Sequence, residues 1–115
     1  MNRARNRLCV ALGLIMLAPG PAMAGSSAGR LTSLGVTDDG ILQFPAGTHI
    51  NTPRCVKRSG TWAISLSRPG AQTMLALLRT AAASDAVVRV DGTGLCDDLA
   101  NHERPREVVL EYPRP

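Results

Sequence analysis

The densest group of side chains that could do chemistry lies near the C-terminal end, in the run Asp97-Asp98-Leu99-Ala100-Asn101-His102-Glu103. If this run is helical, Asp98 and His102 stand four residues apart on one face, a workable spacing for two ligands of a divalent metal. A catalytic metal centre needs a third protein ligand, and His49 is the only other histidine. We favour the alternative that this run is a solvated acidic loop without a metal.

A basic cluster surrounds Cys55, which follows Arg54 and precedes Lys57 and Arg58. Such a cluster could hold an anion or an acidic sugar, although isolated surface cations at the end of a strand are commoner. Together with His49, these three cations are the candidate binding residues of the chain.

Aromatic side chains are scarce, which argues against nucleic acid as a partner. Binding of single-stranded nucleic acid needs stacking aromatics as well as positive charge. Only Phe44, Trp62 and Tyr112 are present, and all three fall on strand faces that we assign to the core. Trp62 could instead stack on a sugar, but its alternation with Ile64 and Leu66 favours a core position.

Motifs for enzymatic catalysis or for a cofactor are absent from the sequence. There is no nucleophile elbow of the G-x-S-x-G kind, and Gly92-Thr93-Gly94 is too short for a phosphate loop. We therefore expect a non-enzymatic protein. Two alternatives stay open: a small periplasmic hydrolase or metal-dependent enzyme using His49, Asp98 and His102, and an enzyme inhibitor that inserts residues 49–53 into a partner's cleft.

Residues 1–24 predict a cleaved secretory signal peptide. Three arginines precede a short apolar run at residues 8–17, a Pro-Gly-Pro break follows, and Ala22-Met23-Ala24 supplies a small-x-small cleavage pattern. The apolar run is too short to span a bilayer, which takes about 20 residues. We expect an exported protein, periplasmic or secreted, with no membrane span.

Cleavage after residue 24 changes the charge and the cysteine count. The leader holds three arginines and no acid, so the 13 Lys+Arg and 9 Asp+Glu of the chain become ten and nine, a net charge of +1. A strongly basic protein would suggest nucleic acid or anionic membrane as partner, and this one does not. Cys55 and Cys96 remain and predict a disulfide in an oxidising compartment.

The 91 residues after the leader are enough for one small domain. The small residues 25–29 predict a flexible N-terminus, and residues 30–115 a single disulfide-stapled domain. Asp39-Gly40 predicts a type I′ hairpin turn, and a 3.6-residue period from Ala71 to Ala82 predicts a helix with a hydroxyl cap near Ser67. Period-two patterns predict strands at residues 30–36, 41–44, 54–57, 61–67, 86–90 and 106–112.

This order predicts a mostly β (α+β) fold. A small five- or six-stranded antiparallel sheet with one helix fits it, and so does an OB-like, partly open barrel with the helix inserted late. The residues carry no signal for an oligomeric state.

A resemblance rests on four stretches: Cys55 through Trp62-Ala63-Ile64, the helix at 77–83, the run 88–96 and Glu107-Val108-Val109-Leu110. They resemble small secreted proteins of Gram-negative bacteria with no assigned activity. The order of elements is more distantly similar to the OB-fold receptor-binding subunits of AB5-type toxins, in topology only. That second resemblance implies a glycan partner and a ring-shaped oligomer. No sugar-contacting motif of those subunits can be placed on this chain, so the more general expectation is a protein or glycan partner in the envelope or outside the cell.

Overall fold

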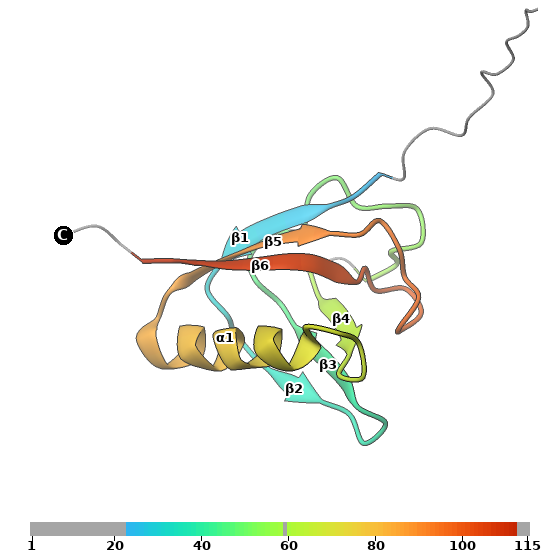
Figure 1. Ribbon diagram of the computed structural model, residues 1–115. Helices are drawn as coiled ribbons and strands as arrows, with labels where there is room; N and C mark the ends of the chain where they lie inside the picture. Colours follow the sequence, from blue (N-terminus) through green and yellow to red (C-terminus); the bar gives the residue numbers. More distant parts are fainter. Residues whose placement is uncertain (1–22, 59, 113–115) are drawn as a thin grey trace, which may run out of the picture.

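The computed structural model describes residues 23–58 and 60–112, which fold into six strands and one helix (Figure 1). The strands form two three-stranded antiparallel sheets, in the orders β1-β5-β6 and β2-β3-β4. The elements are β1 (Ser26–Gly29), β2 (Gly35–Val36), β3 (Ile41–Phe44), β4 (Trp62–Ser65), α1 (Ala71–Ser84), β5 (Val87–Gly92) and β6 (Pro105–Glu111). The mostly β fold with one helix is confirmed. The described strands divide between two sheets and close into no barrel, so the OB-like arrangement stays a prediction.

Strand β1 corrects the expectation of a flexible segment at residues 25–29. The strand pairs antiparallel with β5, and Ser27 lies opposite Val90. Small residues, which suggest flexibility in sequence, are needed here for close approach. A Cβ on Gly29 would lie 2.5 Å from the Cα of Gly47. The folded domain therefore includes residues 25–29, whereas the sequence predicts that it begins at residue 30.

Strands β5 and β6 follow the predicted alternation. Val88 and Val90 are buried and Arg89 is exposed, because successive side chains point to opposite faces of the sheet. The pairing with β6 shifts register between Asp91 and Gly92, which is a β-bulge. Tyr112, predicted to point inward, lies beyond β6 and is 54% exposed, so that assignment is wrong.

The hairpin between β2 and β3 is confirmed, but its turn differs from the prediction. Gly40 donates its N–H to the Thr37 carbonyl at 2.9 Å and is the turn residue with positive φ, at 83°. A type I′ turn would also require positive φ at Asp39, which that residue does not have. The loop is therefore a turn of residues 37–40 in which only glycine takes the left-handed conformation. Strand β2 is also shorter than the predicted strand at 30–36.

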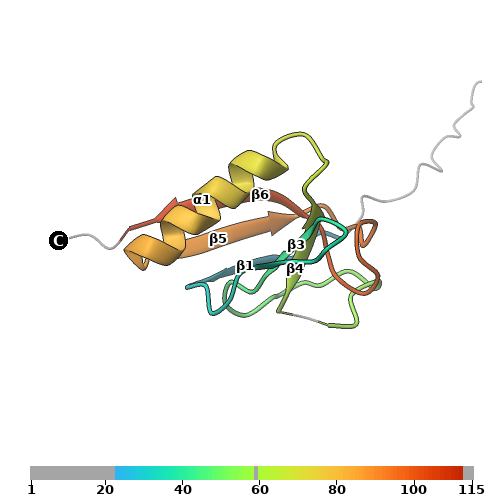
Figure 2. The same cartoon turned by 90° about the horizontal axis from the view of Figure 1, so that it is seen from below.

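Helix α1 lies where the 3.6-residue period predicts it. Its buried residues Ala71, Leu78 and Ala81 form one stripe, and the helix runs alongside β5 and β6 in both views (Figures 1 and 2). The predicted hydroxyl cap is wrong, because the N-cap is Gly70 in the left-handed region, with no side-chain hydrogen bond. Ser67 instead shares a hydrogen bond with the Ser65 hydroxyl.

One hydrophobic core joins the helix to both sheets. Phe44 and Trp62 are fully buried within it, which confirms the core position predicted for Trp62. The full buried cluster is Leu42, Phe44, Ala46, Trp62, Ile64, Ala71, Leu78, Ala81, Ala86, Val88, Val90 and Val108. In the described part of the chain, α1 is neither long nor apolar enough to cross a bilayer.

Candidate functional site

The predicted disulfide is present between Cys55 and Cys96. Their Cα atoms lie 5.9 Å apart, and the bond joins positions 41 residues apart in the sequence. It fastens the loop that carries the basic cluster to the loop that precedes β6. Residues 54–57, predicted as a short strand, form turns instead.

We call Arg54, Lys57 and Arg58 the basic loop. All three residues are exposed. The backbone N–H groups of Lys57 and Arg58 both donate to the carbonyl of Asn101, at 3.1 and 3.2 Å. The disulfide and these two hydrogen bonds hold the loop backbone against the same neighbouring segment.

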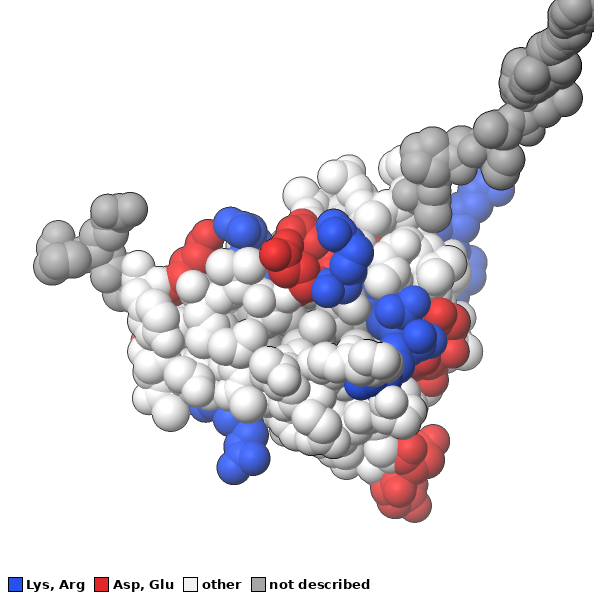
Figure 3. All heavy atoms as spheres, viewed as in Figure 1, with Lys and Arg blue, Asp and Glu red and all other residues white. Residues whose placement is uncertain are grey.

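The cations of the basic loop make no ion pair within the described residues, unlike most of the other cations there. Among the described residues, none of the three makes an ion pair, whereas four other arginines do. The paired set is Arg30–Asp85, Arg68–Asp98, Arg68–Asp97, Arg89–Glu111 and Arg104–Asp97. Figure 3 shows positive and negative side chains beside one another in the upper and right-hand part of the face drawn, while one positive group at the lower left and one negative group at the bottom right stand apart.

His49, the fourth candidate binding residue, lies apart from the basic loop in the core. Its side chain is fully buried, and its ring stacks on Trp62 with centroids 4.1 Å apart. Its Nδ1 accepts a hydrogen bond from the Gly60 N–H at 3.4 Å, which leaves Nε2 to donate to Glu103 Oε1 at 2.8 Å. His49 is therefore not presented to a partner at the surface.

Glu103 is a buried, multiply hydrogen-bonded residue whose position the sequence did not predict. The polar run 97–105 predicts a solvated position for this residue, but its side chain is fully buried. Its carboxylate accepts from the Gly25 N–H at 3.0 and 3.2 Å, from the Gly94 N–H at 2.8 Å and from His49. A Cβ on Gly92 would lie 1.9 Å from Oε2. The glycines around residue 92 are the only sequence signal that a side chain packs closely here.

A histidine beside a carboxylate is also the base-and-orienting pair of many catalytic sites. Here the pair cannot reach a substrate, because both side chains have no exposure. Trp62 lies over His49 and donates its indole N–H to the Ser27 hydroxyl at 2.9 Å. Neither His49 nor Glu103 lines any of three surface grooves of about 370–450 Å³. The arrangement acts as a buried polar centre of the fold.

The proposed metal pair does not form, because residues 97–103 are turns and bends and not a helix. Asp98 accepts hydrogen bonds from Arg68 and Ser65, while the ring of His102 contacts the Ala100 carbonyl at 2.9 Å. These two residues and His49 thus have separate partners. Within residues 23–58 and 60–112, no group of three or more His, Cys, Asp or Glu side chains could hold a metal ion.

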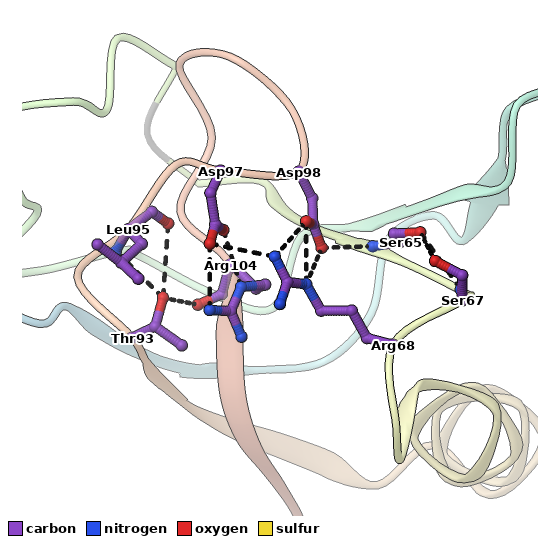
Figure 4. A network of polar contacts seen from close by, with 8 residues as sticks. All are labelled: Ser65, Ser67, Arg68, Thr93, Leu95, Asp97, Asp98 and Arg104. Carbon is purple, nitrogen blue, oxygen red and sulfur yellow. Dashed lines mark hydrogen bonds and ion pairs between the residues drawn. The ribbon is translucent and has the colours of Figure 1, made fainter.

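Asp98 instead belongs to an ion-pair network that anchors the loop before β6 (Figure 4). Arg68 donates from Nε to both Asp98 oxygens, at 2.9 and 2.7 Å, and from Nη2 to Oδ1 at 2.7 Å. The Arg68 hydrogen bonds hold the pKa of Asp98 below its usual value, against the opposing effect of burial, and the Ser65 N–H adds to the lowering.

Asp97 extends this network to Arg104, the residue directly before β6. It accepts from Arg104 Nε at 2.8 Å and from Arg68 Nη2 at 3.1 Å, as Figure 4 shows. The hydrogen bond from Arg104 is the main reason why the pKa of Asp97 is lowered. The same carboxylates, Asp98 first, raise the pKa of Arg68. The acidic run therefore fastens the loop to the start of α1.

Residues 49–53, the segment considered for an inhibitor loop, lie against strand β1. Ile50 and Ser26 exchange two backbone hydrogen bonds, at 3.0 and 2.8 Å. His49 and Pro53 are buried, whereas the Ile50 side chain is 52% exposed. His49 and Ile50, the first two residues of the segment, are therefore held in place, His49 by Glu103 and Ile50 by Ser26.

Comparisons with protein families, with characterised proteins and with solved structures found no match for this chain.

Proposed function

We propose that this protein is an exported, non-enzymatic binding domain of the bacterial envelope or secretome, and that the basic loop contacts its partner. The observation that carries the proposal is that three exposed, unpaired cations lie together in this loop, whereas four of the six arginines elsewhere in the described residues are in ion pairs. A preorganised loop loses less conformational entropy when it binds. The disulfide and the Asn101 contacts supply that preorganisation.

The partner is a protein or glycan that presents clustered negative charge. Exposed ion pairs contribute about 0.2–1 kcal/mol each, so three of them give modest affinity and mainly direct the approach. A glycan partner is also what the likeness to OB-fold receptor-binding subunits implies. Nucleic acid is not proposed, because Phe44 and Trp62 are buried, which leaves Tyr112 as a single exposed aromatic ring and provides no series of stacking platforms.

Export supports the same proposal. Residues 1–24 carry the charge, apolar run and cleavage pattern of a leader, and a disulfide is compatible with an oxidising compartment outside the cytoplasm. Cell fractionation of the expressed full chain in a Gram-negative host tests this, with the protein expected in the periplasm or medium. A protein found only in the cytoplasm would refute it.

A charge-matched pair of variants tests the binding surface. The first combines Arg54→Gln, Lys57→Gln and Arg58→Gln; the second combines Arg30→Gln, Arg79→Gln and Arg89→Gln, which removes the same net charge from other exposed positions. Both are applied to an array of sulfated, carboxylated and neutral glycans, and to a pull-down from envelope extract. We expect about a tenfold loss of binding for the first variant only. Equal losses of binding for both variants would contradict the proposal. Equal binding of the wild-type protein to neutral and to negatively charged glycans would contradict it as well.

A further inference from the structure

Gly25 occupies a position where its backbone nitrogen contacts a buried carboxylate. The nitrogen lies 3.2 Å from Glu103 Oε1 and 3.0 Å from Oε2, and Gly25 itself is buried. The Gly25 carbonyl accepts from the Gly92 N–H at 2.9 Å, and the next residue, Ser26, donates to the Ile50 carbonyl at 3.0 Å. Backbone hydrogen bonds thus hold the chain in place directly after the Gly25 nitrogen.

The carboxylate of Glu103 is fully buried, yet no lysine or arginine of the described residues neutralises its charge. Among the described residues, no lysine or arginine lies within ion-pair distance of it. Its donors are His49 and two backbone N–H groups, those of Gly25 and Gly94. One peptide N–H has a single hydrogen to share between two oxygens. An ammonium group at the same place has three hydrogens and a full positive charge, which is what a buried carboxylate requires.

The chain turns outward directly before this nitrogen. Met23 is 65% exposed and Ala24 is also exposed. The Ala22-Met23-Ala24 pattern predicts cleavage of the bond between Ala24 and Gly25. The cleavage pattern depends only on the sequence, and the contact with Glu103 depends only on the fold. Both involve the same atom, the Gly25 nitrogen.

We propose that hydrolysis of the Ala24–Gly25 bond converts the Gly25 nitrogen into an α-ammonium group that forms a buried ion pair with Glu103. The co-reactants are water and the protease that removes the leader. The C–N bond breaks, the water oxygen joins the Ala24 carbonyl carbon to give the leader's carboxylate, and the freed amine takes up both protons of that water to become the ammonium group. The precursor lacks this ion pair, so processing completes the polar centre of the core.

The identity of residue 25 fits this role. A Cβ at that position would lie 2.6 Å from Glu103 Oε1, 2.8 Å from His49 Nε2 and 2.9 Å from the Ile50 carbonyl. Such contacts are shorter than ordinary van der Waals distances, and two of the three involve buried atoms of the pair itself. Glycine is therefore the residue that lets a chain terminus approach the carboxylate this closely.

The inference rests on the proposed export, and its test separates the two. The exported protein is purified from cells that express the full chain, and its N-terminal peptide is identified by mass spectrometry. We expect it to begin at Gly25. A start at any other residue overturns the inference while leaving export intact, whereas a protein that never leaves the cytoplasm contradicts the proposed function first.

Amine labelling then tests the ion pair directly. The processed protein has two amines, the α-amine of Gly25 and the side chain of Lys57, because Lys57 is the only lysine. An acetylating ester at about pH 7 normally prefers an α-amine, whose pKa of about 7.7–8.0 is lower than that of lysine. In the folded protein we expect exposed Lys57 to be labelled and Gly25 to be protected by at least about tenfold relative to the unfolded protein. Rapid labelling of Gly25 in the folded protein overturns the ion pair.

A stability comparison supplies the second readout. In a Lys57→Arg background, acetylation of the unfolded protein modifies Gly25 alone and keeps its N–H while removing the charge. Refolded side by side, the free-amine protein should have a folding constant about tenfold larger, since a charge-assisted hydrogen bond exceeds a neutral one by about 1–1.5 kcal/mol. In a Glu103→Gln background the difference should fall below about twofold. A difference that persists there, or is absent from both, overturns the inference.

Discussion

Glu103 Oε1 lies 2.8 Å from Nε2 of His49, although 54 residues separate them in the sequence and neither side chain is exposed. The carboxylate also accepts backbone hydrogen bonds from Gly25 and Gly94. One side chain therefore ties together the start of β1, the segment after β5 and the loop around His49. This relationship makes Glu103 the residue on which the stability of the domain should depend most strongly among its charged groups.

We expect Glu103→Ala to lower the free energy of unfolding by about 3–5 kcal/mol, because it leaves His49 and two N–H groups buried without an acceptor. Urea denaturation followed by the emission of Trp62, the only tryptophan, measures this. Glu107→Ala is the matched control, since Glu107 is exposed on β6, and should change stability by less than about 0.5 kcal/mol. Similar effects of both substitutions would disprove the special role of Glu103.

Gly92→Ala should be destabilising by about 1–3 kcal/mol through overpacking. The added Cβ would lie 1.9 Å from Glu103 Oε2 and 2.9 Å from Trp62. Gly35→Ala is the comparison, because a Cβ on that strand residue would meet nothing within 4 Å. Thermal unfolding of the two variants should rank them clearly. Equal melting temperatures would mean that the space beside Glu103 is not filled as described.

Reduction of the Cys55–Cys96 bond should destabilise the domain by up to about 4 kcal/mol, because a loop of this length regains its entropy in the unfolded chain. Unfolding curves with and without reductant give the difference. The double variant Cys55→Ala, Cys96→Ala should not respond to reductant. Thiols that alkylate before reduction in the exported protein would be incompatible with the bond.

Asp98 should contribute to stability at neutral pH and lose its contribution in acid. Its pKa in the folded protein is lowered mainly by Arg68, so the unfolded chain takes up the proton first as the pH falls. The stabilisation is complete above the unfolded pKa of about 3.9 and disappears as the pH falls from there through the lower folded pKa. Asp98→Asn should cost about 1–2 kcal/mol at pH 7, after allowance for solvent screening.

The dependence of the free energy of unfolding on pH in the acid range checks the role of Asp98. Stability of the wild-type protein and of Asp98→Asn, measured at intervals between neutral pH and acid, should converge below the folded pKa. Asp38→Asn is a suitable control, because Asp38 is exposed at the β2–β3 turn. Parallel curves for wild type and Asp98→Asn across the acid range would rule out the ion pair as the cause.

Local features of the sequence were sufficient to predict much of the fold. The apolar period of residues 71–82 predicted α1, the alternation at 62–66 predicted β4, and the valines at 88 and 90 predicted β5. The cysteine pair predicted the disulfide. Each of these signals lies within a short window or follows from a simple count, because helix and strand periods are imposed by the backbone itself.

Features that depend on distant partners were missed. Residues 26–29 show no strand pattern and become β1 only because β5, about 60 residues later, offers its edge. The basic loop was recognised as a cluster, but its rigidity depends on Asn101. His49 was grouped with that loop because it precedes it, yet its side chain turns into the core toward Trp62.

By itself, the sequence determined the leader pattern as a prediction, and helix α1, strands β3 to β6 and the disulfide as confirmed outcomes, since these follow from local periodicity and residue type. Only the tertiary structure decided that Glu103 is buried. An acidic residue in a polar run is usually solvated, and it leaves water only where other parts of the chain supply donors. Those donors, on His49, Gly25 and Gly94, are brought together by the packing of the two sheets.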